Sequence, residues 1–178
     1  QRQMCIRDSY EVYHIPVFSC DTGLYFDEIP DALQPGVHVR RIGGKTLTDE
    51  EMTAYYAAFA ARFGMTSKVF QGNSATPRGL TAQYRNAVCL VMDSTHIYER
   101  MDESTAGRKF LLTDTPHPKR EKGFPLDCLS VDSASGRYYY DLADHATDEI
   151  ASADSRMSQA YARFFSEALE AFHRETGK

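Results

Sequence analysis

The chain has 178 residues, a formal net charge of −5 at pH 7 and 42% hydrophobic residues, a size that suits one globular domain able to fold without a metal or a disulfide. The acidic balance argues against nucleic acid as a partner, because binding to phosphates is driven by Lys and Arg side chains. The sequence has no apolar run of about 18 residues or more, so we expect no membrane span and no membrane partner.

The first nine residues, QRQMCIRDS, have no apolar period, no alternation and no turn chemistry. Back-translation of residues 4–9 gives a reading frame of the end sequence that transposase-based sequencing kits attach to DNA, and codons for residues 1–3 continue one of the adapter primers. We therefore interpret residues 1–9 as translated sequencing adapter in a gene assembled from shotgun or metagenomic reads. Residues 10–178 are expected to form a single globular domain whose native start is unknown.

Two strands are predicted before the first helix. Residues 10–18, YEVYHIPVF, are rich in β-branched and aromatic side chains, and residues 37–42, VHVRRI, alternate apolar and polar side chains. A loop with two prolines, 27–36, separates them, and Gly43 with Gly44 turns the chain after the second strand.

The sequence IGGKT at residues 42–46 follows a strand and precedes a helix, as a phosphate-binding loop does. That pattern requires a glycine five positions before the second glycine of the pair, and Val39 occupies this position. The helix also begins several residues too late for its N-terminus to point at a phosphate. We therefore predict a hairpin-type turn here rather than a nucleotide-binding loop.

The first helix is predicted over residues 49–63. Thr48 and Glu51 have the spacing of a capping box, in which each side chain satisfies a backbone N–H that the helix start leaves free. Gly64 ends the helix, because glycine readily adopts the left-handed conformation found after a helix C-terminus.

The second half of the chain is predicted to be strands followed by one long helix. Residues 115–125, TPHPKREKGFP, form a basic, proline-rich loop that is either a mobile surface loop or a binding loop. The C-terminal helix spans about 154–176 and carries a broad apolar stripe, made of Met157, Tyr161, Phe164, Phe165, Ala168, Leu169 and Phe172. The predicted strands are 67–72, 86–92, 95–101, 108–114, 126–132 and 136–142.

This order of elements predicts an α+β fold. We expect a curved, mostly antiparallel β-sheet packed on a long C-terminal helix plus one shorter helix, in a helix-grip-like arrangement. Such a fold by itself assigns no function.

The cysteines favour a reducing compartment. Cys20, Cys89 and Cys128 lie beyond the first nine residues, and none belongs to a CxxC pair or to a zinc-type spacing. Cys89 lies in the apolar run AVCLVM and is expected to be buried. A soluble, cytoplasmic protein is the simplest interpretation.

The segment DSTHIYER at residues 93–100 carries the main candidate site. On a strand, His96, Tyr98 and Arg100 share one face, which would supply an acid or base, a hydrogen-bond donor and an anion clamp. We predict His96 and Tyr98 as catalytic residues, and Arg85 and Arg100 as ligand-binding residues. The alternative is the solvent-facing side of a hairpin.

The segment YYYDLADHATDE at residues 138–149 carries two weaker candidates. On a strand, Tyr138 and Tyr140 point to one side and could line a ligand pocket, although an ordinary division between core and surface explains them as well. Helical spacing pairs Asp141 with His145 and Asp144 with Asp148, and Asp141, His145 and Asp148 are weak candidates for binding a divalent metal. Acidic residues also gather at helix starts for structural reasons.

Two functional hypotheses remain open. The first is a small-molecule-binding domain, catalytic or not, that binds a carboxylated or phosphorylated ligand between sheet and helix, with His96 as acid or base and an arginine as anion clamp. The second is a non-enzymatic acidic interaction or inhibitor protein, viral or bacterial, that uses a Tyr-rich surface. The sequence identifies no cofactor and no oligomeric state.

Overall fold

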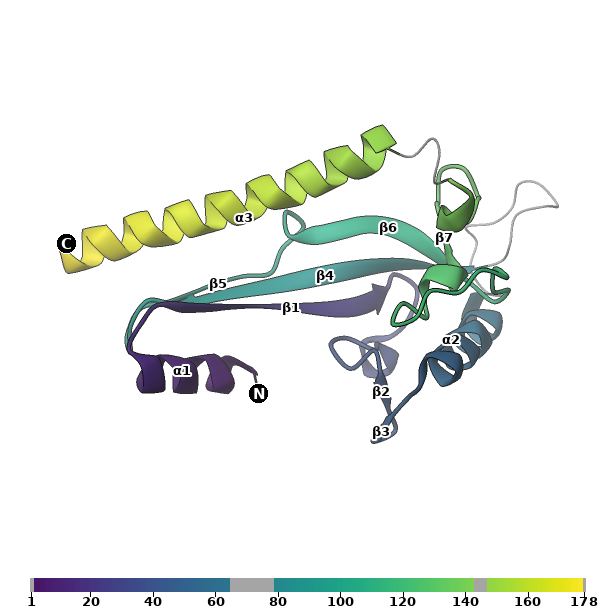
Figure 1. Cartoon of the computed structure of the whole chain (residues 1–178), viewed down its shortest axis with the longest axis horizontal. Coiled ribbons are helices and arrows are strands. Elements are labelled where there is room, and N and C mark those ends of the chain that lie inside the picture. Colours follow the sequence, from purple (N-terminus) through teal and green to yellow (C-terminus); the bar gives the residue numbers. More distant parts are fainter. Residues whose placement is uncertain (1, 65–78, 143–146, 178) are drawn as a thin grey trace. The chain divides into compact units, whose positions relative to one another are not determined.

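The computed structural model describes residues 2–64, 79–142 and 147–177 (Figure 1). Within the chain two compact units form, and we describe each by itself. Unit 1 comprises Gln1–Thr22, Arg85–Gly107 and Ala151–Lys178, and unit 2 comprises Gly23–Tyr84 and Arg108–Ile150. The strand predicted at 67–72 lies outside the described residues.

The α+β class predicted from the sequence is confirmed. A curved, mostly antiparallel sheet has the strand order β1-β4-β6-β7, with β5 paired to β4. Its strands are β1 (Val17–Phe26), β4 (Gly79–Val91), β5 (Ile97–Arg100), β6 (Ala106–Thr113) and β7 (Ser130–Val131). The helices are α1 (Arg2–Tyr13), α2 (Asp49–Gly64) and α3 (Thr147–Thr176). None of the helices in the described ranges has the length and hydropathy that a bilayer-spanning helix requires.

In unit 1 the C-terminal helix packs on one face of β4 and β5. Val88 and Leu90 on β4 are buried with Phe164 and Ala168 of α3 in one apolar cluster. Tyr98 lies opposite Leu90 in the antiparallel β4–β5 pair and joins the same cluster. Most of the apolar stripe predicted for the last helix therefore contacts the sheet, whereas Leu169, which was predicted to belong to it, is exposed.

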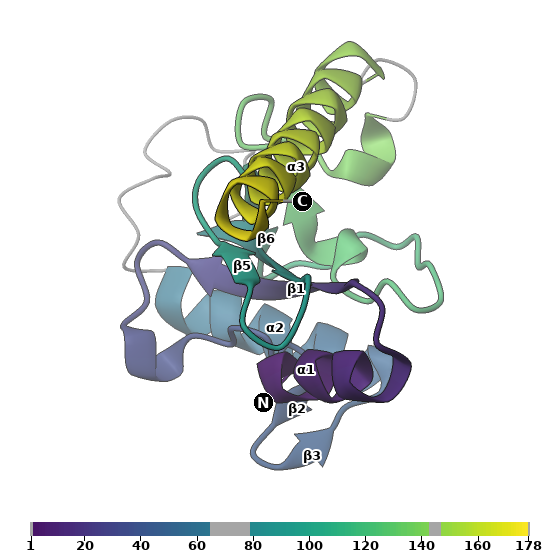
Figure 2. The same cartoon turned by 90° about the vertical axis from the view of Figure 1, so that its left-hand side faces the viewer.

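The intervening residues of β4 face the other side, where α1 packs. Cys89 and Val91 are buried with Ile6 of α1, and Tyr10 packs against them. The strand portion of unit 1 thus lies between α1 and α3, as Figure 2 shows.

The strand predicted over residues 10–18 is only partly correct. Residues 10–13 belong to α1, and the strand β1 begins at Val17. Ile6 and Tyr10 are four residues apart, so one helical face reaches the sheet, and this packing overrides the β propensity of the segment. His14, with φ of 51°, ends the helix in the left-handed conformation.

The core of unit 2 forms where α2 packs on the sheet. Met52 and Tyr56 of α2 are buried among apolar residues of β1, β4 and β6, and the Tyr56 hydroxyl donates to the Val39 carbonyl at 2.9 Å. The predicted capping box is present: the Thr48 N–H donates to Glu51 Oε2 at 2.9 Å, and the Glu51 N–H donates to Thr48 Oγ1 at 3.2 Å. The helix therefore begins where the sequence predicts.

The turn predicted at the glycine pair is confirmed, whereas the strand before it is shorter than predicted. The strands β2 (Arg41–Ile42) and β3 (Lys45–Thr46) form a two-residue hairpin in which Ile42 pairs with Lys45. Gly43 and Gly44 have φ values of 58° and 81°. Positive φ at both central residues is what a type I′ hairpin turn requires, so this segment is a hairpin and not a phosphate-binding loop.

The hairpin predicted from 126–132 and 136–142 is much reduced. Short 3₁₀ helices cover Asp127–Leu129 and Tyr139–Asp141, and the only bridge between the two segments joins Val131 to Tyr138. Leu126, Cys128 and Leu129 are all buried, which a helical turn permits and strict alternation on a strand does not.

Candidate functional site

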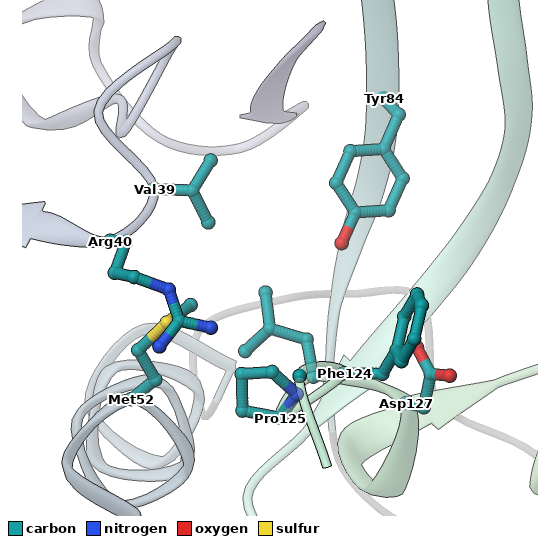
Figure 3. A pocket seen from close by; sticks show the side chains of 9 residues that line it. Val39, Arg40, Met52, Tyr84, Phe124, Pro125 and Asp127 are labelled. Carbon is teal, nitrogen blue, oxygen red and sulfur yellow. The ribbon is translucent and has the colours of Figure 1, made fainter. Parts of the chain in front are cut away.

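A cleft of about 220 Å³ opens in unit 2 (Figure 3). Its walls come from four places in the chain: the segment before β2, the first turns of α2, the strand β4 and the end of the basic loop. We call it the unit 2 cleft, and its lining residues are Val39, Arg40, Met52, Tyr84, Gly123, Phe124, Pro125, Leu126 and Asp127.

Tyr84 supplies a hydrogen-bond donor at the cleft. Its ring stacks on Phe110 of the strand β6 with a centroid distance of 5.5 Å and an interplanar angle of 23°. This contact holds the Tyr84 ring in one orientation. Burial, with a smaller contribution from Asp127, raises the pKa of Tyr84 to about 12. The phenol therefore stays protonated at neutral pH.

Asp127 supplies the acceptor. It lies half-buried at the start of a 3₁₀ helix, and burial, followed by repulsion from Glu121, raises the pKa of its carboxyl above the ordinary value of 3.8. A carboxylate in such a place gains from a ligand that donates hydrogen bonds, because burial has removed water from it.

Arg40 supplies the cation. Its Nη1 lies 2.8 Å from Asp49 Oδ1 and donates to the Leu47 carbonyl at 3.1 Å. Figure 3 shows its guanidinium and the Tyr84 hydroxyl approaching the cleft from different walls. Phe124 lies at the rim with 60% of its surface exposed, which leaves an aromatic face for a ligand.

The unit 2 cleft can therefore hold a planar ring. Apolar and aromatic walls would contact the faces of such a ring, while one carboxylate and two donors would contact its polar edge. Its volume of about 220 Å³ is below the roughly 300 Å³ of typical small-molecule pockets. A ligand larger than this volume would fit only in part.

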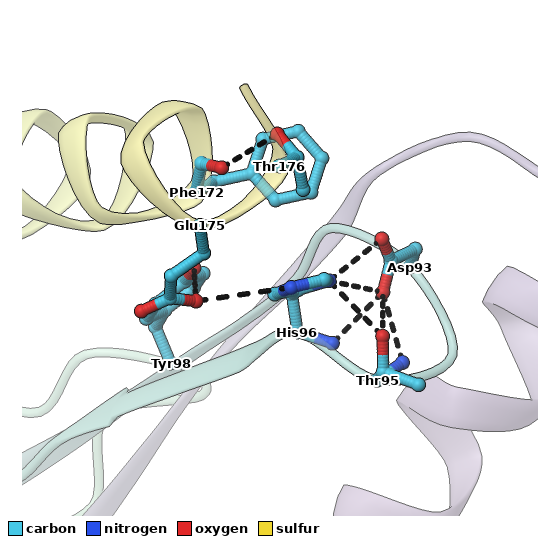
Figure 4. Close-up of polar contacts among 7 residues, drawn as sticks. All are labelled: Asp93, Thr95, His96, Tyr98, Phe172, Glu175 and Thr176. Carbon is cyan, nitrogen blue, oxygen red and sulfur yellow. Dashed lines mark hydrogen bonds and ion pairs between the residues drawn. The ribbon is translucent and has the colours of Figure 1, made fainter. Parts of the chain in front are cut away.

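The predicted catalytic residues lie together in unit 1, His96 directly before β5 and Tyr98 on it, and both face α3 (Figure 4). His96 Nδ1 lies 2.8 Å from Asp93 Oδ1, its Nε2 lies 3.8 Å from Glu175 Oε2, and its ring meets Phe172 edge-on at 5.2 Å. The Tyr98 hydroxyl donates to Glu175 Oε2 at 3.2 Å. The shared face predicted from strand alternation is thus present, and the α3 helix covers it.

The two arginines predicted to bind a ligand also lie in unit 1. Arg100 Nη2 donates to Glu167 Oε2 at 2.6 Å, and its Nε lies 3.7 Å from Asp102 Oδ2. Arg85 lies half-buried on β4. Arg100 is therefore engaged with two carboxylates.

Asp93 orders the turn that presents His96. The Thr95 backbone N–H and the His96 imidazole both bond to its carboxylate, and together they hold the pKa of Asp93 well below its ordinary value of 3.8. The carboxylate is therefore ionised at neutral pH and fixes the ring orientation.

Tyr138 and Tyr140 surround His117 in unit 2. Their ring centroids lie 5.2 and 5.4 Å from that of His117. His117 Nε2 lies 3.2 Å from Asp141 Oδ1, and its Nδ1 accepts the Lys119 N–H at 3.1 Å. Asp141, predicted as a weak metal ligand, is thus placed beside the base of the basic loop.

The other two predicted metal ligands, His145 and Asp148, cannot be placed beside Asp141 from the described side chains. His145 lies outside the described residues, and Asp148 lies in the first turn of α3 where the backbone alone is described. Within the described ranges, no group of three or more His, Cys, Asp or Glu side chains could hold a metal.

Arg40, Tyr84 and Asp127 were not predicted from the sequence. They lie far apart in the chain, and their convergence depends on the sheet. One signal was present: Asp127 is the one charged residue in the otherwise mostly apolar stretch GFPLDCLSV at 123–131.

No family model and no curated protein matches the sequence. Solved structures match the fold. A HAM1 protein from Coxiella burnetii is 16% identical with a TM-score of 0.58, and the match covers 94% of this chain and 74% of that one. A nucleoside-triphosphatase, or dITP/XTP pyrophosphatase, from Mycobacterium abscessus is 19% identical with a TM-score of 0.59, and the match covers 89% of this chain and 70% of that one. The Ham1 protein of Staphylococcus aureus is 14% identical with a TM-score of 0.51, and the match covers 80% of this chain and 64% of that one. At these identities the likeness is one of fold.

Proposed function

We propose that the protein is a nucleotide-binding enzyme that hydrolyses a nucleoside triphosphate to the monophosphate and pyrophosphate, with the base in the unit 2 cleft. The observation that carries the proposal is the set of polar groups at the cleft: a carboxylate on Asp127, and donors on Arg40 and Tyr84, between apolar walls. The fold supports it, since a neighbour of that fold is described as a dITP/XTP pyrophosphatase.

The polar edge of an oxopurine would suit this cleft. The ring N–H groups of such a base donate hydrogen bonds, which the Asp127 carboxylate accepts. Its carbonyl oxygens accept hydrogen bonds, which the protonated Tyr84 hydroxyl can donate, and Arg40 offers a further donor at the same cleft. Sites that pair a substrate N–H or C=O with a buried partner discriminate strongly against bases that lack it, because the partner is then left unsatisfied.

A hydrolysis assay tests the proposal. The purified chain is incubated with ITP, XTP, ATP and GTP and a divalent cation, and pyrophosphate is measured. We expect release from an oxopurine nucleotide, and a several-fold loss of kcat/KM in Asp127→Asn. Asp31→Asn, an exposed aspartate in the same unit, is the matched control. The absence of pyrophosphate release with all four nucleotides would refute the proposal.

The proposal agrees with the sequence-based hypothesis that the ligand is phosphorylated, but it assigns recognition of the ligand to Arg40, Tyr84 and Asp127 rather than to the residues predicted from the sequence. His96 as acid or base and Arg85 or Arg100 as anion clamp stay predictions. His96 and Arg100 are engaged with carboxylates inside unit 1, so they would have to exchange those partners for a ligand.

Binding to a protein partner is a second candidate. Four large apolar side chains at the end of α1 and the start of β1 are more than half exposed: Val12, Tyr13, Ile15 and Phe18. Large apolar side chains mark an interaction surface where they are exposed side by side. The tyrosines at 138–140, predicted either to line a ligand pocket or to divide between core and surface, are half-buried.

A further inference from the structure

The first turn of α2 holds two walls of the unit 2 cleft through one carboxylate. Asp49 Oδ1 lies 2.8 Å from Arg40 Nη1. The other oxygen of the same side chain, Oδ2, accepts the Gly123 N–H at 2.8 Å, across 74 residues of sequence. Arg40 and Gly123 both line the cleft, so Asp49 joins two lining segments without lining the cleft itself.

A second contact from the same turn fixes the loop end. The Thr53 hydroxyl lies 3.0 Å from the carbonyls of both Asp49 and Pro125. The segment from Gly123 to Pro125 is therefore attached to α2 at two points. Because a helix is rigid over one turn, these attachments set the position of the loop end relative to Arg40.

Arg40 keeps donors for a ligand. Both of its polar contacts, with Asp49 and with the Leu47 carbonyl, use Nη1. Among the described residues it has no other hydrogen-bond partner, so Nε and Nη2 remain available. A guanidinium fixed through one nitrogen is preorganised, and a preorganised donor loses less entropy when it binds.

We propose that Arg40 is the cation of the unit 2 cleft that binds an oxygen acceptor of the ligand, and that Asp49 is a positioning residue that orients Arg40 and the Gly123 segment. The acceptor is either a carbonyl oxygen of the base or a phosphate oxygen, since both carry negative charge that a guanidinium recognises. This inference rests on the proposed nucleotide function for the identity of the ligand. The positioning role of Asp49 stands without it.

Hydrogen exchange at the Gly123 amide tests the positioning role without any ligand. Asp49→Ala removes the acceptor of that N–H, so exchange in the segment 119–125 should become at least several-fold faster. Asp49→Asn keeps an acceptor oxygen and loses the charge on which Arg40 depends, so its effect on exchange should be smaller. Glu50→Gln, an exposed acid in the same turn, is the control that should leave exchange unchanged. Exchange in Asp49→Ala equal to that of the unmodified chain would overturn the positioning role.

Steady-state kinetics test Arg40. Arg40→Ala should raise KM for the best nucleoside triphosphate by about tenfold or more, the loss expected for a charged hydrogen bond. Arg40→Lys should recover little of it, because a lysine cannot reproduce the guanidinium fork. Asp49→Asn should raise KM in the same direction with kcat nearly unchanged. Arg62→Ala, at the exposed end of α2, is the control.

Two competitive inhibitors identify the oxygen that is bound. Weaker inhibition of Arg40→Ala by inosine alone assigns Arg40 to the base, and weaker inhibition by inorganic tripolyphosphate alone assigns it to the phosphates. Unchanged KM and unchanged inhibition by both would overturn the role of Arg40. An unmodified chain that hydrolyses no nucleoside triphosphate would refute the proposed function and the role of Arg40 together, while the exchange experiment would still decide the role of Asp49.

Discussion

Two acidic side chains of unit 2 have opposite relations to their surroundings. Asp49 is stabilised as a carboxylate, because the Gly123 N–H, followed by Arg40, lowers its pKa. Asp127 has a raised pKa because burial, together with Glu121, disfavours its charge. The first arrangement is typical of a structural carboxylate, and the second of a group kept ready for a ligand.

The raised pKa of Asp127 predicts a pH-dependent cost in stability. Because its folded pKa lies above the ordinary 3.8, the fold disfavours the carboxylate. This cost is absent below the unfolded pKa and becomes complete as the pH rises past the folded one. Asp127→Asn should therefore raise the melting temperature near neutral pH, and the gain should disappear below 3.8.

Thermal unfolding of Asp127→Asn across this pH range is the measurement, with Asp31→Asn as the reference. A variant that is less stable than the unmodified chain near neutral pH would show that Asp127 has a stabilising partner in the folded state. The same variant should bind nucleotide more weakly, which separates a residue kept for binding from one kept for stability.

The predicted catalytic role of His96 can be separated from its structural contacts. Its ring packs against Phe172 and bonds to Asp93, so His96→Ala should lower the melting temperature. The sequence-based hypothesis further expects activity to be abolished. The test measures both kcat/KM and the melting temperature, with His38→Ala at an exposed position as the control. If the His96→Ala variant is destabilised but keeps its activity, the role of His96 is structural and not catalytic.

At the scale of elements, the sequence predicted those that local chemistry specifies. The helix α2 was predicted almost to the residue, because a capping box and a terminal glycine mark both of its ends. The glycine pair likewise specified the β2–β3 turn. The α1 helix was missed because neither capping nor a full apolar stripe marks it. The region around β7 was predicted as a hairpin because a short apolar segment looks the same in the sequence whether a strand or a 3₁₀ turn buries it.

The long helix α3 makes a prediction that the structure sharpens. The apolar period identified Phe164 and Phe165 as alternatives for burial. Phe164 is 3% exposed and packs with Val88 and Leu90, whereas Phe165 is half-buried and meets Phe18 edge-on at 5.4 Å.

Phe164→Ala should therefore lower the free energy of unfolding by about 3–5 kcal/mol, through lost transfer energy and the cavity left behind. Phe165→Ala should cost clearly less, and Arg163→Ala, exposed on the same turn, should cost little. Urea unfolding curves of the three variants provide the test. Equal midpoints for Phe164→Ala and Arg163→Ala would show that α3 does not pack on β4 as described.

At the scale of the molecule, the candidate site could not be predicted because it belongs to no single segment. Arg40, Tyr84 and Asp127 reach the unit 2 cleft from a loop, a strand and a 3₁₀ turn. In the sequence each has an ordinary explanation as a surface or core residue. The face shared by His96, Tyr98 and Arg100 was predictable because strand alternation is local, but the covering helix that fills it with carboxylates was not.

The N-terminal segment provides a test on the whole chain. We propose that residues 1–9 are translated adapter and take no part in function, and none of them lines the unit 2 cleft. A chain that begins at Ser9 with an added Met should therefore keep the nucleotide turnover of the longer chain.

The stability of this shortened chain should nevertheless fall, because Ile6 is 6% exposed and packs with Cys89 and Val91. Losing one such aliphatic side chain costs about 1.5–3 kcal/mol, measured as a shift of the urea midpoint. The Ile6→Ser variant of the full chain should show a similar loss if this side chain is the cause. A truncated chain that folds and loses turnover would refute the adapter interpretation, because a sequence added in the laboratory has no reason to serve catalysis.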